Sequence, residues 1–115
     1  MILGIGVDVV EIARIQRAIE QRPRFLQRIF TPAEQEIVRV SEEAAGRWAA
    51  KEAMIKAIGY RIPWQTMEVL RDWAGKPLAT VKRDIGRGPI RMHVTITHDA
   101  GLSIAFAVLE SVDKA

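Results

Sequence analysis

The sequence GRWAAKEAMIKAIG, at residues 46–59, decides how the rest of the chain is arranged. Its apolar residues recur at helical spacing: Trp48, Ala49, Ile55 and Ile58. This spacing predicts a helix with one side covered by a core. Glu52 and Lys56 stand four residues apart and therefore share a face, while Arg47 and Lys51 stand four apart on a neighbouring stripe. The helix is thus predicted to present one carboxylate among three cations.

Two interpretations of this arrangement stay open. A carboxylate can bind a divalent metal ion, and nearby cations can bind the phosphates that the same metal contacts. Alternatively, Glu52 and Lys56 form an ordinary solvated ion pair, because opposite charges at this spacing are common on exposed helix faces.

The composition is that of a small folded protein. With 115 residues, of which 49% are hydrophobic and 27% charged, the chain is expected to form one domain over 1–115. No apolar run reaches the length of a membrane span, and the opening residues lack the pattern of a secretory leader. The absence of cysteine fits a reducing compartment. We therefore expect a cytoplasmic protein that does not contact a membrane.

The positive charge is concentrated near the N-terminus. The net charge is +3, and the stretch 12–28 holds five arginines against the single acid Glu20. These arginines are Arg14, Arg17, Arg22, Arg24 and Arg28. Such a surface is expected to bind an acidic partner, either a nucleic acid or an acidic protein.

The first strand is predicted from a nearly continuous apolar run over residues 2–9. The run indicates a buried strand that ends at Asp8. Asp8 is then either a functional carboxylate, because burying it without a partner is costly, or the N-cap of the next helix.

Three helices are predicted next. Isoleucines at helical spacing indicate a helix over 11–21, which Pro23 ends. The sequence Thr-Pro-Ala-Glu at 31–34 is typical of a helix start, and this helix is expected to run to about residue 40. Ser41 is predicted to cap the central helix and Gly59 to end it.

The second half is predicted to form strands. Residues 67–73 and 78–82 look like strands joined by the turn at 74–77, and strict alternation marks 90–97 and 102–109 as two more. A strand, then helices, then a run of hairpin strands predicts an α+β fold in which an antiparallel sheet packs on helices.

Several kinds of chemistry are excluded by the residues present. GIGVDV, at residues 4–9, lacks the third glycine of a dinucleotide-binding motif, because Val9 stands in its place. With no cysteine and two histidines, neither a zinc site nor a catalytic triad is expected. Asp8 and Glu52 remain as joint ligands for Mg²⁺. His98 enters a turn at a strand end, where functional groups collect, although an exposed structural histidine is the alternative.

The motifs together resemble a known family. GIGVDVVEIARI, FLQRIFTPAE, GRWAAKEAMIKAIG, GKP and HVTITH occur in the order and at the chain length of the holo-(acyl-carrier-protein) synthases. This family is the small bacterial branch of the 4'-phosphopantetheinyl transferases. The early GIG-x-D combined with the later W-A-A-K-E-A-x-x-K-A is a specific signature, whereas neither half alone is.

The resemblance implies a reaction of fatty acid biosynthesis. Such enzymes transfer the phosphopantetheine arm of coenzyme A to a serine of apo acyl carrier protein and release adenosine 3',5'-bisphosphate. By the family pattern, Asp8 and Glu52 bind Mg²⁺ and are catalytic, together with Lys56. Glu52 is expected to act as the base, directly or through a metal-bound water, and Lys56 to contact the pyrophosphate.

The resemblance also assigns binding residues. Coenzyme A is expected to meet Arg47, Lys56 and His98 through its phosphates, and Gly75, Lys76, Pro77 and Thr97 on the adenine side. The acidic acyl carrier protein is expected to dock on Arg14 above all, then on Arg24 and Arg28; charge alone adds Arg17 and Arg22. The family assembles as a homotrimer with active sites between neighbouring subunits, which is expected here too.

One residue departs from the family pattern, and two alternative functions remain open. Asp99 follows His98 where the family often has Ser or Thr, and a carboxylate there would repel a phosphate. The main rival is a non-enzymatic basic module that binds RNA or another phosphate polymer. RNA readers usually expose stacking aromatics, for which Trp64, Trp73 and Tyr60 are the free candidates. A protein-binding scaffold, the second rival, requires neither predicted metal ligand.

Overall fold

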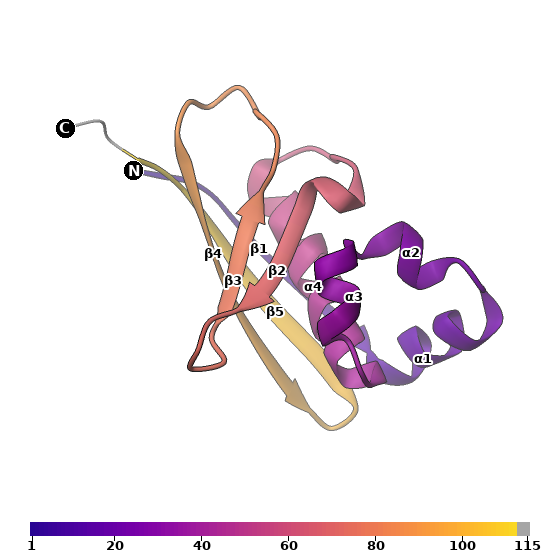
Figure 1. Cartoon of the computed structure of the whole chain (residues 1–115). Coiled ribbons are helices and arrows are strands. Elements are labelled where there is room, and N and C mark those ends of the chain that lie inside the picture. The colour runs from indigo at the N-terminus through magenta and orange to yellow at the C-terminus, as the bar shows by residue number, and fades with distance from the viewer. Residues whose placement is uncertain (113–115) are drawn as a thin grey trace.

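A long central helix separates the strands from the other helices. The computed structural model describes residues 1–112, so the last three residues of the expected domain lie outside the described part. The elements follow in the order β1 (Ile2–Glu11), α1 (Ile12–Gln21), α2 (Phe25–Ile29), α3 (Pro32–Ile37), α4 (Ser41–Ile58), the 3₁₀ turn η1 (Trp64–Thr66), β2 (Met67–Arg71), β3 (Pro77–Val81), β4 (Ile90–Asp99) and β5 (Leu102–Ser111). Figure 1 shows α1–α3 on one side of the molecule, the strands on the other and α4 between them.

The strands form two antiparallel sheets. One contains β1, β5 and β4 in that spatial order, and the other is the β2–β3 hairpin. Gly6 pairs with Ala107 and Val7 with Phe106, while Val94 pairs with Ala107 from the other side. This arrangement confirms the predicted α+β class with antiparallel sheets packed on helices.

The two glycines of GIGVDV allow α4 to approach β1 very closely. A Cβ atom on Gly4 would lie 1.9 Å from the carbonyl oxygen of Ala57, and one on Gly6 would lie 2.0 Å from that of Ala53. No side chain fits at such distances. These glycines therefore serve backbone-to-backbone packing of helix on strand.

Strand β1 differs from its prediction in both burial and length. Ile5, Val7 and Val9 are 60%, 52% and 56% exposed, because α4 covers one face of the sheet and the described chain leaves the other bare. The prediction of a fully buried strand is therefore wrong. The strand also continues to Glu11, so Asp8 lies in its middle, and Glu11 rather than Asp8 occupies the N-cap of α1.

The local helix signals are largely confirmed. The Thr31 hydroxyl accepts a hydrogen bond from the Glu34 amide at 3.2 Å, and the Thr31 amide donates to Glu34 Oε1 at 2.9 Å, which completes a capping box. Gly59 ends α4 with φ 97°. Helix α3 ends earlier than expected, at Ile37, and Ser41 is the first residue of α4 rather than its cap.

Candidate functional site

The predicted catalytic residues lie where α4 crosses β1. Lys56 Nζ donates to the carbonyl oxygen of Val7 at 2.8 Å and lies 3.3 Å from Asp8 Oδ1. The close packing of Gly4 on Ala57 and of Gly6 on Ala53 holds β1 against the C-terminal half of α4. The structure thus brings Lys56 to Asp8 on β1, an edge strand of the sheet, and Glu52 lies four residues before Lys56 on the same side of α4.

The pairing of these charges differs from an ordinary helical ion pair. Lys56 pairs with Asp8, and Glu52 pairs with Arg61 at 3.4 Å. The side chains of Asp8 and Glu52 are 18% and 17% exposed, so both carboxylates are accessible but largely shielded. Glu52 and Lys56 therefore each pair with a residue outside α4, in place of the solvated Glu52–Lys56 pair that was the alternative.

The donor set at this edge suits a hard cation. Within residues 1–112, no group of three or more His, Asp or Glu side chains is arranged to hold a metal ion. Mg²⁺, however, is typically bound through one or two carboxylates, with water and substrate phosphates completing its shell. Asp8 and Glu52 fit that requirement, and Lys56 beside them can contact the same phosphates.

A second group of predicted residues lines one cleft of about 220 Å³. Its lining consists of Glu43, Gly46, Arg47, Val69, Leu70, Arg71, Gly75, Pro77, Ile96 and His98. Four predicted coenzyme A contacts, Arg47, His98, Gly75 and Pro77, are therefore brought together. Lys76 is absent from this lining and borders a neighbouring hollow. Thr97 lies on the opposite face of the sheet from His98, because adjacent side chains of a strand alternate.

Arg47 is held firmly at the base of this cleft. The residue is 7% exposed, and its Nε donates to the carbonyl oxygen of Val69 at 2.9 Å. Burial lowers the pKa of the Arg47 guanidinium, and the nearby charge of Arg71 acts in the same direction. Arg71, which sequence reasoning missed, pairs with Glu43 at 2.7 Å. Nothing in the local sequence distinguishes it, since its place in the cleft depends on the β2–β3 hairpin.

His98 is oriented by two contacts. Its Nδ1 lies 2.6 Å from the Ser103 hydroxyl on the paired strand, which leaves Nε2 for a ligand. A Cβ on Gly46 would lie 3.0 Å from His98 Cε1, so the glycine makes room for the imidazole against α4. Asp99, being the next residue of β4, points to the opposite face. The predicted repulsion between Asp99 and a bound phosphate is thereby avoided.

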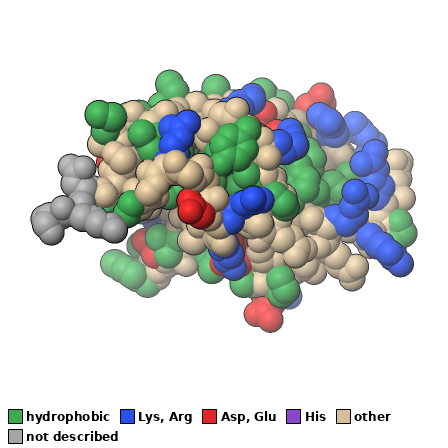
Figure 2. Space-filling model, turned by 90° about the horizontal axis from the view of Figure 1, so that it is seen from above, with side chains coloured by type: hydrophobic (Ala, Val, Ile, Leu, Met, Phe, Trp, Pro, Cys, Tyr) green, Lys and Arg blue, Asp and Glu red, His purple; other side chains and the backbone are tan. Residues whose placement is uncertain are grey.

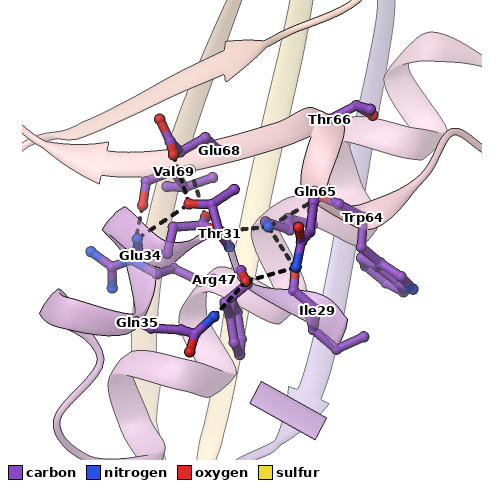
Figure 3. Close-up of polar contacts among 12 residues, drawn as sticks. Ile29, Thr31, Glu34, Gln35, Arg47, Trp64, Gln65, Thr66, Glu68 and Val69 are labelled. Atoms are coloured by element: carbon purple, nitrogen blue, oxygen red, sulfur yellow. Dashed lines mark hydrogen bonds and ion pairs between the residues drawn. The ribbon is translucent and has the colours of Figure 1, made fainter. Parts of the chain in front are cut away.

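Lys51 does not belong to this charged surface, which corrects the predicted arrangement of one carboxylate among three cations. It is 0% exposed, and its Nζ lies 2.6 Å from Glu34 Oε1. The other oxygen of Glu34 accepts from the Val69 amide at 2.7 Å. Figure 3 shows this buried network between α3, α4 and β2, together with the hydrogen bond from Thr31 to Glu68 at 2.6 Å. Glu34 thus fastens the hairpin that forms one wall of the cleft.

The arginine-rich segment forms a separate surface. Figure 2 shows Lys and Arg side chains gathered at the end of the molecule where α1 and α2 lie. Two adjoining hollows, of about 590 Å³ and about 200 Å³, are bordered by these arginines: Arg22, Arg24 and Arg28 in the larger, and Arg14, Arg17 and Arg22 in the smaller. Both hollows share an aromatic floor in which Trp48 stacks on Phe25, with ring centroids 5.7 Å apart. Trp64, predicted to be available for stacking on a ligand, instead stacks on Trp48, with ring centroids 4.8 Å apart.

Within residues 1–112, no helix is both long and apolar enough to cross a membrane.

Comparison with known proteins gives one consistent result. The family model described as the 4'-phosphopantetheinyl transferase superfamily matches residues 4–115. The chain is 46% identical to the holo-[acyl-carrier-protein] synthase of Clavibacter sepedonicus, over 96% of this chain and 97% of that protein. It is 43% identical to that of Halalkalibacterium halodurans, over 99% and 100%.

Solved structures agree with these sequences. A holo-(acyl-carrier-protein) synthase from Bacillus anthracis in complex with CoA (3',5'-ADP) has a TM-score of 0.84 and 34% identity, covering 97% of this chain and 99% of that one. The synthase of Helicobacter pylori in complex with coenzyme A has a TM-score of 0.86 and 30% identity, covering 92% and 99%.

Proposed function

The chain belongs to the 4'-phosphopantetheinyl transferase superfamily, and we propose that it moves the phosphopantetheine arm of coenzyme A onto a serine of apo acyl carrier protein. The observation that carries the proposal is the pairing of Lys56 on α4 with Asp8 on the edge strand β1, with Glu52 four residues before Lys56 on the same helix. It occurs in a chain that matches holo-[acyl-carrier-protein] synthases over almost its full length.

The residues at that edge have separate roles in the transfer. The serine oxygen attacks the phosphorus that bears the pantetheine arm, and the bond from that phosphorus to the bridging oxygen breaks, releasing adenosine 3',5'-bisphosphate. Glu52 accepts the serine proton, and the Lys56 ammonium contacts the pyrophosphate oxygens, where charge accumulates. Asp8 and Glu52 would hold Mg²⁺, which neutralises the pyrophosphate when bound. Asp8 also positions Lys56, at 3.3 Å.

The cleft lined by Arg47 and His98 is proposed to bind the nucleotide end of coenzyme A. Arg47, Arg71 and His98 supply hydrogen-bond donors for a phosphate. Gly75 and Pro77 form part of the cleft wall. Both solved relatives named above are complexes with CoA or its 3',5'-ADP part, which supports the binding of such a nucleotide by this fold.

The arginine-bordered hollows on α1 and α2 are proposed to dock the acidic carrier protein. Arg14, Arg24 and Arg28 border an apolar floor, which is the usual arrangement of a polar rim around an interface core. Because such rim charges mainly steer association, we expect the transfer rate at low carrier concentration to fall as salt increases.

The bare face of the main sheet is proposed to be covered by further copies of this chain in a homotrimer. Ile5, Val7, Val9 and Phe106 form a contiguous apolar patch, since Val7 pairs with Phe106 and the isoleucine and valine at positions 5 and 9 flank that pair. Patches of this kind on otherwise polar proteins usually mark an interface. The patch adjoins the proposed active-site edge, because Lys56 borders the same groove as Val7 and Phe106.

Intact-mass spectrometry of an apo acyl carrier protein incubated with this protein, coenzyme A and Mg²⁺ tests the proposal. We expect the carrier to gain one phosphopantetheine group, and the gain to be lost with a chelator and in Glu52→Gln and Asp8→Asn. Glu42→Gln, on the exposed first turn of the same helix, is the matched control and should remain active.

Two outcomes would count against parts of this account. A gain that persists in both carboxylate variants would leave the reaction standing and remove the assigned ligands. No gain with several carriers, from protein that is folded, would overturn the transferase and return the basic module as the better interpretation.

A further inference from the structure

The tip of the β2–β3 hairpin exposes one indole almost completely. Trp73 is 98% exposed, more than any other large apolar side chain in the described part of the chain. The other two tryptophans stack on one another with ring centroids 4.8 Å apart. Leaving a large aromatic surface in water forgoes the free energy that burial provides, so its exposure suggests a ligand that covers it.

The backbone holds this tip in a defined conformation. Asp72 Oδ1 accepts hydrogen bonds from the amides of Ala74 at 2.8 Å and Lys76 at 2.9 Å. The Asp72 amide donates to the Lys76 carbonyl at 2.9 Å, and the Gly75 amide to the Asp72 carbonyl at 3.0 Å. Gly75 adopts φ 85°, which favours glycine. Trp73 therefore projects from a turn closed by four hydrogen bonds, so little backbone entropy is lost when a ligand meets it.

The turn adjoins the cleft that binds the nucleotide end of coenzyme A in the proposed function. Trp73 lies two residues after Arg71 and two before Gly75, both of which line that cleft. Two residues of chain span at most about 7 Å. The Trp73 backbone therefore lies within about 7 Å of two residues that line the cleft. A nucleotide whose phosphate contacts Arg47, Arg71 and His98 carries a flat base that can extend from the cleft toward this turn.

We propose that Trp73 is a substrate-binding residue that stacks on the adenine base of coenzyme A. This inference rests on the proposed function, because it requires coenzyme A as the substrate. Stacking on an indole recognises the flat face of a base rather than its hydrogen-bonding edge. Trp73 therefore contributes affinity for any purine ring at this position and none for the sugar or phosphates.

The test is a binding comparison with and without the base. Adenosine 3',5'-bisphosphate and ribose 3,5-bisphosphate are titrated by calorimetry into wild type, Trp73→Ala and Trp73→Phe. We expect Trp73→Ala to raise the Kd of the nucleotide roughly 10-fold and to leave that of the ribose compound unchanged, while Trp73→Phe stays within about 3-fold of wild type. Nucleotide binding should also quench part of the tryptophan fluorescence in wild type, and this part should be missing in Trp73→Phe.

The outcomes separate this inference from the function on which it rests. Equal nucleotide affinity in Trp73→Ala and wild type, with transferase activity intact, overturns the stacking and leaves the function standing. If Trp73→Ala binds the nucleotide as wild type does but has a higher KM for the carrier protein, the stacking is also overturned, because the indole then contacts the carrier protein. Wild-type protein that neither binds coenzyme A nor modifies a carrier overturns both.

Discussion

Replacing Lys51 with methionine removes an ammonium group that is 0% exposed and sits among three oxygens. Its Nζ lies 2.6 Å from Glu34 Oε1, 2.8 Å from the Ile29 carbonyl and 3.2 Å from the Trp64 carbonyl. Methionine is close in length, so the change deletes the charge and the hydrogen bonds with little loss of volume.

The cost follows from what is left behind. Glu34 keeps two amide donors, Thr31 at 2.9 Å and Val69 at 2.7 Å, but loses its cation, and breaking a buried ion pair in this way costs about 3–5 kcal/mol. A domain of this size has a free energy of unfolding of about 5–15 kcal/mol. With a urea dependence of about 2 kcal/mol per molar, the unfolding midpoint should fall by about 2 M.

Lys56→Met is the matched control, because it makes the same chemical change one turn and a half along α4. The Lys56 side chain is 54% exposed, and exposed ion pairs contribute about 0–1 kcal/mol, so the urea midpoint should barely move. Transferase activity should show the opposite order: retained per folded molecule in Lys51→Met and lost in Lys56→Met. A loss of activity in Lys51→Met at unchanged stability would refute the purely structural role of Lys51.

Three further changes have definite expected outcomes. Gly6→Ala should destabilise the protein by at least about 3 kcal/mol in urea unfolding, because the added Cβ would lie 2.0 Å from a backbone oxygen of α4; a loss below 1 kcal/mol would mean that the helix moves freely. Burial raises the pKa of Glu68, but hydrogen bonds from Thr31 and Lys82 outweigh it, so the pKa lies below the usual 4.5. The folded state then binds fewer protons than the unfolded state, so stability is present above pH 4.5 and declines as pH falls toward the folded pKa; Glu68→Gln should flatten this decline in urea midpoints measured from pH 7 to pH 3. Phe106→Asp should convert a trimer into monomers in analytical ultracentrifugation, and an unchanged mass would reject the proposed interface.

Features set by neighbouring residues were predictable from the sequence. The capping box at Thr31 and Glu34 and the left-handed end of α4 at Gly59 depend on a few residues each, and both occur as expected. The gathering of Asp8 with Lys56 required the resemblance, because they are 48 residues apart and no local pattern links them.

Lys51 shows where helical spacing gives the wrong answer. We expected one covered side on α4, which would have left Arg47 and Lys51 at the surface. The helix instead has buried residues all around it, since the sheet packs on one side and the other helices and β2 on the other. A lysine on such a helix requires a buried partner, and Glu34, which the sequence indicates only as part of a helix start, provides it.

The outer face of β1 shows the opposite deviation: side chains predicted to be buried are exposed. A continuous apolar run is typical of a strand covered on both faces, yet Ile5, Val7 and Val9 are more than half exposed in the single chain. The sequence pattern and the monomer agree only if a second surface covers this face, which is what the proposed trimer supplies. Because Lys56 and Val7 border the same groove, covering that face would also enclose one side of the proposed active-site edge. Assembly and chemistry would then depend on the same strand, with its glycines packing on α4, its Asp8 holding Lys56 and its outer side chains binding another copy.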